Sequence, residues 1–222
     1  MRSNLDDQLE KLNQEMILMG TLAETAIEGA CKAFTERDLP KARDIMASDP
    51  AIDRQERDIE SLCLSMLLRQ QPVARDLRLI SSALKMITDM ERIGDQASDI
   101  AEIVTMLDPA MQTPPPHIAA MAAEARGMVH RAIDAYVQRN VELAAEVIDR
   151  DDTVDDLFLD VKRELAGTIA TSHGADEMGV AQSTLDMLMI AKYLERIADH
   201  ATNIAEWVQY AVTSLYKGAP LA

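Results

Sequence analysis

Acidic side chains at helical spacing are the residues of this chain whose pattern could do chemistry. The stretches "DMERIGDQASDIAEIV" (89–104) and "YLERIADHATNIAEWV" (193–208) share most of their polar positions. At about 100° per residue, the four acids of the first stretch share an arc of about 80°, opposite an apolar side. They are Glu91, Asp95, Asp99 and Glu102, and their counterparts are Glu195, Asp199, Asn203 and Glu206. Because like charges this close repel one another, the pattern predicts a bound cation.

Two further acid pairs have the same i,i+4 spacing. They are Asp49 with Asp53, and Asp151 with Asp155. In a three-helix bundle the helix with such a pair neighbours the helix with the acidic arc, so each half could bring two pairs together. A like-charge pair at this spacing destabilises a helix by roughly 0.2–0.5 kcal/mol. Within the stretches 89–104 and 193–208 neither Lys nor Arg falls inside the arcs, and Arg92 and Arg196 lie at their edge. A cation would explain both facts, whereas the alternative is a solvated surface stripe.

The donors are nearly all oxygen, which favours hard ions such as Mg²⁺, Mn²⁺, Ca²⁺ or iron over a structural zinc site. A di-iron enzyme is a weaker interpretation. Such enzymes use Glu-x-x-His motifs that project into the bundle core, and none of the four histidines follows a Glu at that spacing. His200 is predicted to lie at the rim of the acidic arc. Without a phosphate loop, a nucleophile elbow or a Cys-x-x-Cys motif, a binding protein is favoured over an enzyme.

The charge of the chain restricts its partners. With 38 acids against 22 Lys and Arg, the formal net charge is −16, so nucleic acid and anionic membranes are disfavoured as main partners. No apolar run reaches the roughly 18–20 residues of a membrane span, and no signal-peptide pattern is visible. We therefore expect a cytoplasmic protein. Cys31 and Cys63 lie in apolar helical stretches and are expected to be core thiols rather than a disulfide.

The fold class predicted is all-α. Aromatic residues make up only 3% of the chain, helix formers dominate, and strand-like runs are scarce. Apolar periodicity predicts six helices, with a kink or restart at Pro50 and a proline-rich linker at 109–116. The predicted helices cover roughly 5–36, 40–69, 75–107, 117–138, 141–171 and 178–216. The resulting prediction is two tandem three-helix bundles, residues 1–108 and 117–222.

An internal duplication explains this organisation. At an offset of 102 residues "FTERDL" aligns with "YVQRNV", so that Asp38 matches Asn140. The third helices align at an offset of 104, which pairs their acids. Two positions differ: Asp99 is matched by Asn203, and Asp89 by Tyr193. The second site therefore has fewer charges, and we expect it to bind fewer ions or to bind them more weakly.

The stretches "QPVARDLRLISSALKMITDMERIGD" and "MIAKYLERIADHATNIAEWV" resemble the PhoU family over essentially the whole chain. The resemblance implies a regulator without enzymatic activity, which restrains the phosphate-starvation response and modulates phosphate uptake. It also implies coupling of the phosphate ABC transporter ATPase, PstB, to the sensor histidine kinase PhoR. A homodimer is implied, with the membrane reached only through those partners.

The family's acid motifs hold metal, and this implies two ligand sets here. The first is Asp49, Asp53, Glu91 and Asp95, and the second is Asp151, Asp155, Glu195 and Asp199. Asp99 and Asn203 are expected as peripheral ligands. The metal is expected to be a divalent or iron-type ion (Fe, Mn, Mg or Zn). A metal-dependent helical-bundle enzyme and a purely structural helical module remain the alternatives.

Overall fold

The computed structural model describes residues 2–107, 114–172 and 177–220. The helices are α1 (Arg2–Glu36), α2 (Leu39–Gln70), α3 (Ala74–Met106), α4 (Pro116–Gln138), α5 (Val141–Asp149), α6 (Asp151–Thr171) and α7 (Glu177–Thr213). A two-residue hairpin of β1 (Leu215–Tyr216) and β2 (Ala219–Pro220) follows α7. The all-α class is confirmed, as are two tandem three-helix bundles, with α5 and α6 together taking the place of the fifth predicted helix.

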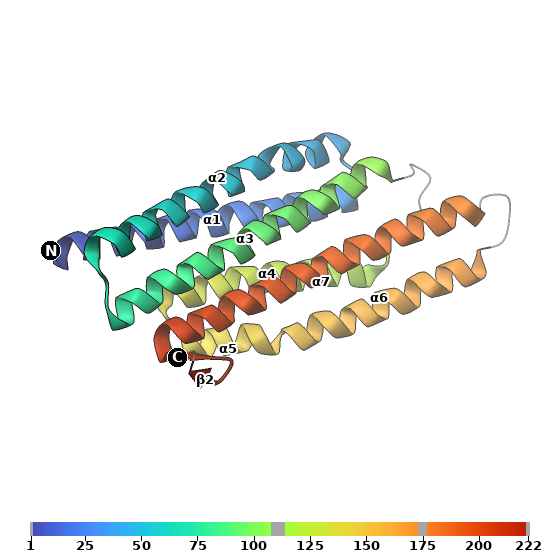
Figure 1. Ribbon diagram of the computed structural model, residues 1–222. Coiled ribbons are helices and arrows are strands. Elements are labelled where there is room, and N and C mark those ends of the chain that lie inside the picture. The colour runs from blue at the N-terminus through green and yellow to red at the C-terminus, as the bar shows by residue number, and fades with distance from the viewer. Residues whose placement is uncertain (1, 108–113, 173–176, 221–222) are drawn as a thin grey trace.

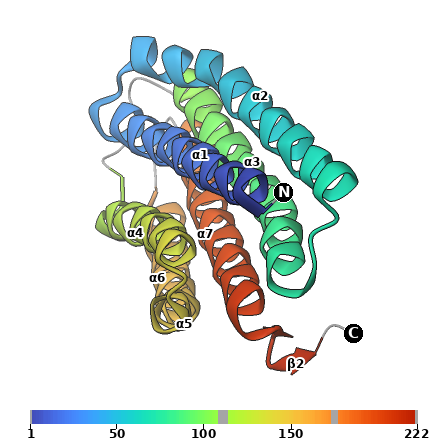
Figure 2. The ribbon, with the colours of Figure 1, turned by 90° about the vertical axis from the view of Figure 1, so that its left-hand side faces the viewer.

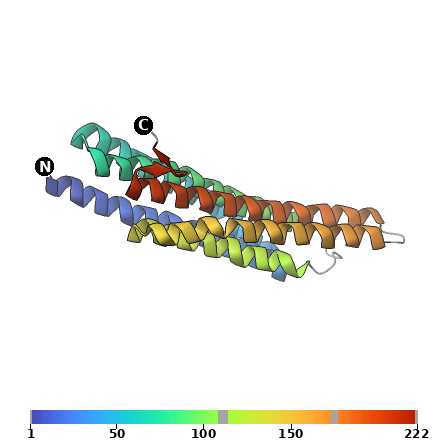
Figure 3. The ribbon, with the colours of Figure 1, turned by 90° about the horizontal axis from the view of Figure 1, so that it is seen from below.

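The two bundles pack side by side through their third helices. Figures 1 and 2 show α3 and α7 as antiparallel neighbours. Figure 3 shows α1 and α4 together on one side of that pair, where they also contact each other. The buried face of α3 consists largely of Ala, Ile and Met, and that of α7 largely of Ala, Ile and Leu. Among the described helices, none has the length and apolar character that crossing a bilayer requires.

The duplication is visible in the local backbone. Arg37 and Arg139 follow the first helix of each bundle in the left-handed conformation, with φ of 55° and 53°. The next residue caps the following helix in both bundles. The Asp38 carboxylate accepts from the Lys41 amide at 3.0 Å, and the Asn140 side chain accepts from the Leu143 amide at 3.0 Å. Both residue types are favoured N-caps, so the same two-residue turn recurs in both halves.

The predicted restart at Pro50 is wrong, because α2 continues as one helix through this residue, whereas the kink stays a prediction. The interruption lies instead in the second bundle at Arg150, between α5 and α6. There the Thr153 amide bonds to the Arg150 carbonyl at 3.0 Å, so the turn tightens locally to i,i+3 spacing. The Arg150 guanidinium also reaches Glu124 on α4 at 2.9 Å. In α2 the buried Ile52 anchors the helix just beyond the proline.

Two other boundaries differ from the prediction or escape it. The sixth predicted helix ends at Thr213 rather than near residue 216, because the chain turns through Ser214 (φ 68°) into the hairpin. That hairpin was not predicted. Most of the predicted linker at 109–116 lies outside the described residues, and Pro116 already begins α4. The domain boundaries at 108 and 117 therefore stay predictions.

The two cysteines are free thiols, as predicted. Cys63 is buried, and Cys31 is half-buried beside the core. Burial raises the pKa of each thiol to about 12. Both thiols are protonated at neutral pH and therefore poor nucleophiles and metal ligands.

Candidate metal centres on the two acidic faces

The first acidic face combines carboxylates from α2 and α3. It consists of Asp49, Asp53, Glu91, Asp95 and Asp99. Burial raises the pKa of Asp49, and the carboxylates of Asp95, Asp53 and Asp99 raise it further. The pKa of Glu91 is likewise raised, first by burial and then by Asp95. These mutual effects place both predicted acid pairs of this half in one electrostatic neighbourhood, with Asp49 inside a continuous helix despite Pro50.

A glycine sets the spacing of the two helices at this face. Gly94 lies between Glu91 and Asp95, and a Cβ added there would be 2.7 Å from the Ile52 Cδ1 atom. The absence of a side chain therefore lets α2 approach α3 closely where the acids meet. In the second bundle the equivalent positions hold Ala198 and Val154, both buried. Relative to the first bundle, the residue on the third helix of the second bundle is larger by one methyl group, and the residue on the second helix is smaller by one carbon.

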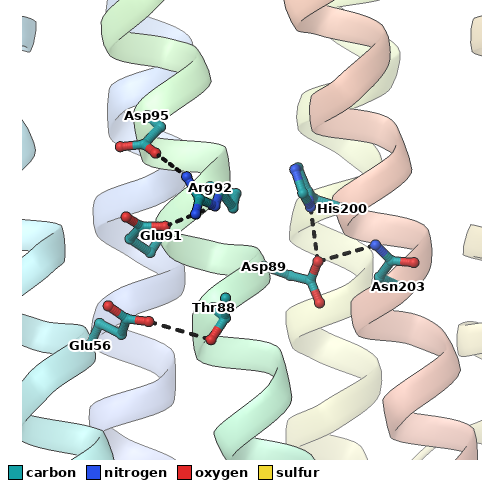
Figure 4. A network of polar contacts seen from close by, with 8 residues as sticks. All are labelled: Glu56, Thr88, Asp89, Glu91, Arg92, Asp95, His200 and Asn203. Carbon is teal, nitrogen blue, oxygen red and sulfur yellow. Dashed lines mark hydrogen bonds and ion pairs between the residues drawn. The ribbon is translucent and has the colours of Figure 1, made fainter.

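An arginine contacts the first acidic face. The Arg92 Nη1 atom lies 3.1 Å from the Asp95 Oδ2 atom, and its Nε atom lies 3.6 Å from the Glu91 Oε2 atom. Figure 4 shows the guanidinium between these two side chains. Arg92 lowers the pKa of Glu91 against the larger effects of burial and Asp95. The arginine thus offsets part of the repulsion that a metal ion would otherwise relieve.

The second acidic face consists of Asp151, Asp155, Glu195, Asp199 and Asn203, contributed by α6 and α7. Burial raises the pKa of Asp151, with Asp199 as the next cause. The pKa values of Asp155 and Asp199 are raised by burial and then by Glu195. As in the first half, the structure brings the two predicted acid pairs together.

The cations around the second face differ from those around the first. The Lys192 ammonium forms an ion pair with Glu195. The Lys217 ammonium, in the hairpin, lies 2.9 Å from the Glu206 Oε2 atom. Beside these groups is an open pocket of about 750 Å³, whose wall includes Asp151 and Asp199. Asp151 and Asp199 in this wall were expected from the sequence, whereas Lys217 in the same wall was not.

Asn203 and Asp99, the expected peripheral ligands, also contact the opposite bundle. Across the α3–α7 interface the Asn203 amide donates to the Asp89 Oδ1 atom at 3.1 Å. His200 contacts the same oxygen through Nδ1 at 2.8 Å, as Figure 4 shows. The Tyr193 hydroxyl hydrogen-bonds to Asp99 and lowers its pKa against burial and the neighbouring acids.

These contacts explain the two mismatches between the halves. Asp89 corresponds to Tyr193, and Asn203 corresponds to Asp99. The Asp89–Asn203 and Asp99–Tyr193 contacts therefore each join one acid to one uncharged side chain. Two acids at either place would repel each other in a half-buried site. These two mismatched positions are a sequence signal from which the contact between the bundles could have been predicted.

The donor set fits a hard cation, but its geometry is not that of a formed coordination shell. Within residues 2–107, 114–172 and 177–220, no three Asp, Glu, His or Cys side chains are gathered closely enough to hold an ion. The carboxylates are half-buried or exposed and face outward from the core.

Comparison with known proteins identifies the family. The PhoU domain model matches twice, at residues 16–104 and 118–208. The chain belongs to the PhoU family. A phosphate-specific transport system accessory protein PhoU homolog of Clostridium acetobutylicum is 36% identical over 96% of this chain and 95% of its own. A homolog of the same name from Synechocystis is 37% identical over 96% of this chain and 92% of its own.

Solved PhoU structures have the same fold. The crystal structure of PhoU from Pseudomonas aeruginosa superposes with a TM-score of 0.87 at 33% identity, covering 95% of this chain and 99% of that one. The phosphate transport system regulatory protein PhoU from Streptococcus pneumoniae gives a TM-score of 0.87 at 25% identity, over 96% and 98% of the two chains. The two PhoU domains thus correspond to the two bundles.

Proposed function

We propose that this protein is the accessory regulator of a phosphate-specific transport system, which restrains phosphate uptake and the phosphate-starvation response when phosphate is plentiful. The observation that carries the proposal is the pair of PhoU domains, in a chain aligned almost end to end with relatives named as accessory proteins of that system. The role is regulatory and not catalytic. Outward carboxylates suit a binding surface better than the enclosed di-iron centre of a bundle enzyme.

The two acidic faces are proposed to bind divalent or iron-type metal ions (Fe, Mn, Mg or Zn). Clustered carboxylates with raised pKa values on both faces support this part of the proposal. A bound cation would offset the repulsion within each face, which makes the metal a structural or sensory element. The first face, with Asp99 where the second has Asn203, is the stronger of the two proposed sites.

The partners proposed are the transporter ATPase PstB and the sensor kinase PhoR, bound in the cytoplasm by a homodimer of this chain. The membrane is then reached only through those partners. A net charge of −16 supports association with basic protein surfaces and opposes nucleic acid as a partner.

The test is a pull-down from phosphate-replete cells with the tagged full chain. The ATPase and the kinase are expected to be recovered, and phosphate-starvation genes should be derepressed in a strain lacking the protein. Absence of both partners would contradict the regulatory role. A variant with Glu91, Asp95, Glu195 and Asp199 changed to Ala separates the metal from the partners. If it retains both bound metal and repression, the acidic faces are not the metal sites that the function needs.

A further inference from the structure

We propose that the β1–β2 hairpin is a removable cap on the second acidic face. Lys217 acts there as a built-in cation, and a divalent ion entering the face releases the hairpin from α7. The inference rests on the metal binding proposed above and adds its regulation: the chain itself competes with metal in one half of the molecule.

Two adjacent residues of the hairpin contact Glu206 and Trp207 of α7. The Lys217 ammonium lies 2.9 Å from the Glu206 Oε2 atom, and the Tyr216 hydroxyl donates to the same oxygen at 3.4 Å. The Tyr216 ring stacks on the Trp207 indole, with 4.3 Å between ring centroids and 27° between the planes. One carboxylate of α7 therefore accepts from both polar groups of the hairpin.

The hairpin has little stability of its own. Only Leu215 with Pro220 and Tyr216 with Ala219 are paired across it, and an isolated two-stranded hairpin is marginal in water. Lys217 lies at its tip in the left-handed conformation, with φ of 49°, which is unfavourable for a side chain with a Cβ. Its place on α7 depends on the contacts with Glu206 and Trp207 and on the Leu215 amide, which donates to the Thr213 hydroxyl at 3.1 Å.

Lys217 is also part of the wall of the pocket beside the second face. The same pocket is lined by Asp151, Asp199 and Glu206. The ammonium thus lies where it can neutralise carboxylates that would otherwise attract a metal ion. An ion bound at Asp151 and Asp199 would repel the Lys217 ammonium in the same pocket, since both are positive. By linkage, metal binding and hairpin docking weaken each other to the same extent.

The first bundle provides the contrast. Glu102, the counterpart of Glu206, is exposed. In the part of the chain that the structure describes, no lysine forms an ion pair with it. Among the described residues the cap therefore belongs to the second face alone. The positive charge of Lys217 weakens metal binding there, in addition to the loss of the carboxylate that Asn203 replaces.

Trp207 is the only tryptophan of the chain, so the fluorescence of the protein reports whether the hairpin is docked on it. Trp207 emission is recorded during an Mn²⁺ titration of the full chain carrying Glu91→Gln and Asp95→Asn, so that binding at the second face is isolated. The emission maximum is expected to move to longer wavelength as Tyr216 leaves the indole. The position of the maximum is followed because paramagnetic quenching changes the intensity.

Two variants and a control test the competition by equilibrium dialysis. Lys217→Met should bind Mn²⁺ roughly tenfold more tightly, because a nearby positive charge is removed, and its emission should lie at longer wavelength before metal is added. Tyr216→Ala should also bind more tightly, since it loosens the hairpin and keeps the lysine. Lys32→Met is the matched control, because it removes an ammonium from the exposed Lys32–Glu36 pair on α1, and it should change neither quantity.

The outcomes separate the two proposals. If Mn²⁺ binds but Trp207 emission does not move, and Lys217→Met has unchanged affinity, the cap is wrong and the metal proposal stands. If no variant binds Mn²⁺ at the second face, metal binding there is wrong and the cap fails with it.

Discussion

The two acidic faces share their carboxylates but differ in the cations that surround them. In the first, Arg92 contacts two acids of α3. In the second, Lys192 and Lys217 each pair with a different glutamate of α7. The two halves thus share the two acid pairs of each face, while Asp99 is replaced by Asn203 and the surrounding cations differ. We therefore expect the two proposed metal sites to respond to the same metal at different concentrations.

Other differences between the bundles occur as compensating pairs. Ile52 packs on Gly94 in the first bundle, and the buried Val154 and Ala198 occupy the equivalent positions in the second. Each pair fills similar space with the methyl groups distributed differently, as close packing demands. Charge is compensated in the same way at the interface, where Asp89 and Asp99 each contact an uncharged residue of the other half. Single substitutions that copy one half into the other should therefore be unfavourable, whereas paired ones should be tolerated.

Metal stabilisation should distinguish the faces most strongly. At Mn²⁺ about 100 times the Kd of the first face, binding adds about 2.7 kcal/mol to the free energy of unfolding. Glu91→Gln with Asp95→Asn should abolish most of the Mn²⁺-induced rise in Tm. The matched change, Glu195→Gln with Asp199→Asn, should remove a smaller part. Thermal unfolding with and without Mn²⁺ measures both, and an equal loss in the two variants would contradict the ranking.

Replacing Gly94 by alanine, the residue type of its counterpart Ala198, should destabilise the protein. Gly94→Ala places a Cβ against Ile52, and such overpacking costs about 1–3 kcal/mol. Adding Ile52→Val should recover most of the loss in urea unfolding. Val154→Ile recreates the crowding against Ala198 and should be unfavourable too. If the double variant is no more stable than Gly94→Ala alone, the packing explanation is wrong.

Replacing Asn203 by aspartate, the residue type of its counterpart Asp99, should lower the free energy of unfolding by about 1–2 kcal/mol. Asn203→Asp puts a second carboxylate beside Asp89 in a half-buried site, where repulsion is poorly screened. Asp89→Asn in the same chain restores one acid and one amide at the contact. A double-mutant cycle on the unfolding free energy gives the coupling, and additive effects would show that the two residues do not interact.

The smallest effect expected is a gain in stability. Asp49→Asn should stabilise the metal-free protein at neutral pH by about 0.2–0.5 kcal/mol, because it removes a like charge from the first face. Asp58→Asn, an exposed change on the same helix, is the control and should be neutral.

The gain from Asp49→Asn also has a pH dependence. The pKa of Asp49 is raised in the folded state by burial and neighbouring acids, so its contribution favours folding more as the pH falls. The gain should therefore vanish below about pH 4, where the ordinary carboxyl pKa lies. Urea unfolding across this range measures it, and a gain that persists in acid would rule out charge repulsion as the cause.

Much of the fold could be predicted because helical periodicity and duplication are local properties of the sequence. The six predicted helices and the two bundles followed from apolar spacing and from the internal repeat. The acid pairs were predicted to meet because helices two and three of a small bundle must be neighbours. The mutual pKa effects of these acids agree with that placement.

The rest depends on contacts between segments distant in sequence. The break at Arg150 accompanies an ion pair to Glu124 on another helix, and the hairpin depends on the stacking of Tyr216 on Trp207. The pairing of Asp89 with Asn203 needs the orientation of one bundle against the other. Periodicity within one helix contains none of this information.

The two-residue turns at Arg37 and Arg139 determine which way each acidic face points. One residue there adopts the left-handed conformation and the next caps the following helix. Both residues of each turn therefore have a fixed role, and neither turn can absorb an extra residue without a change in conformation. One residue inserted after Arg37 and absorbed into α2 would rotate that helix by about 100° about its axis. Asp49 and Asp53 would then point away from α3. The shortest connection in each half therefore sets the rotational register of half of its candidate ligands.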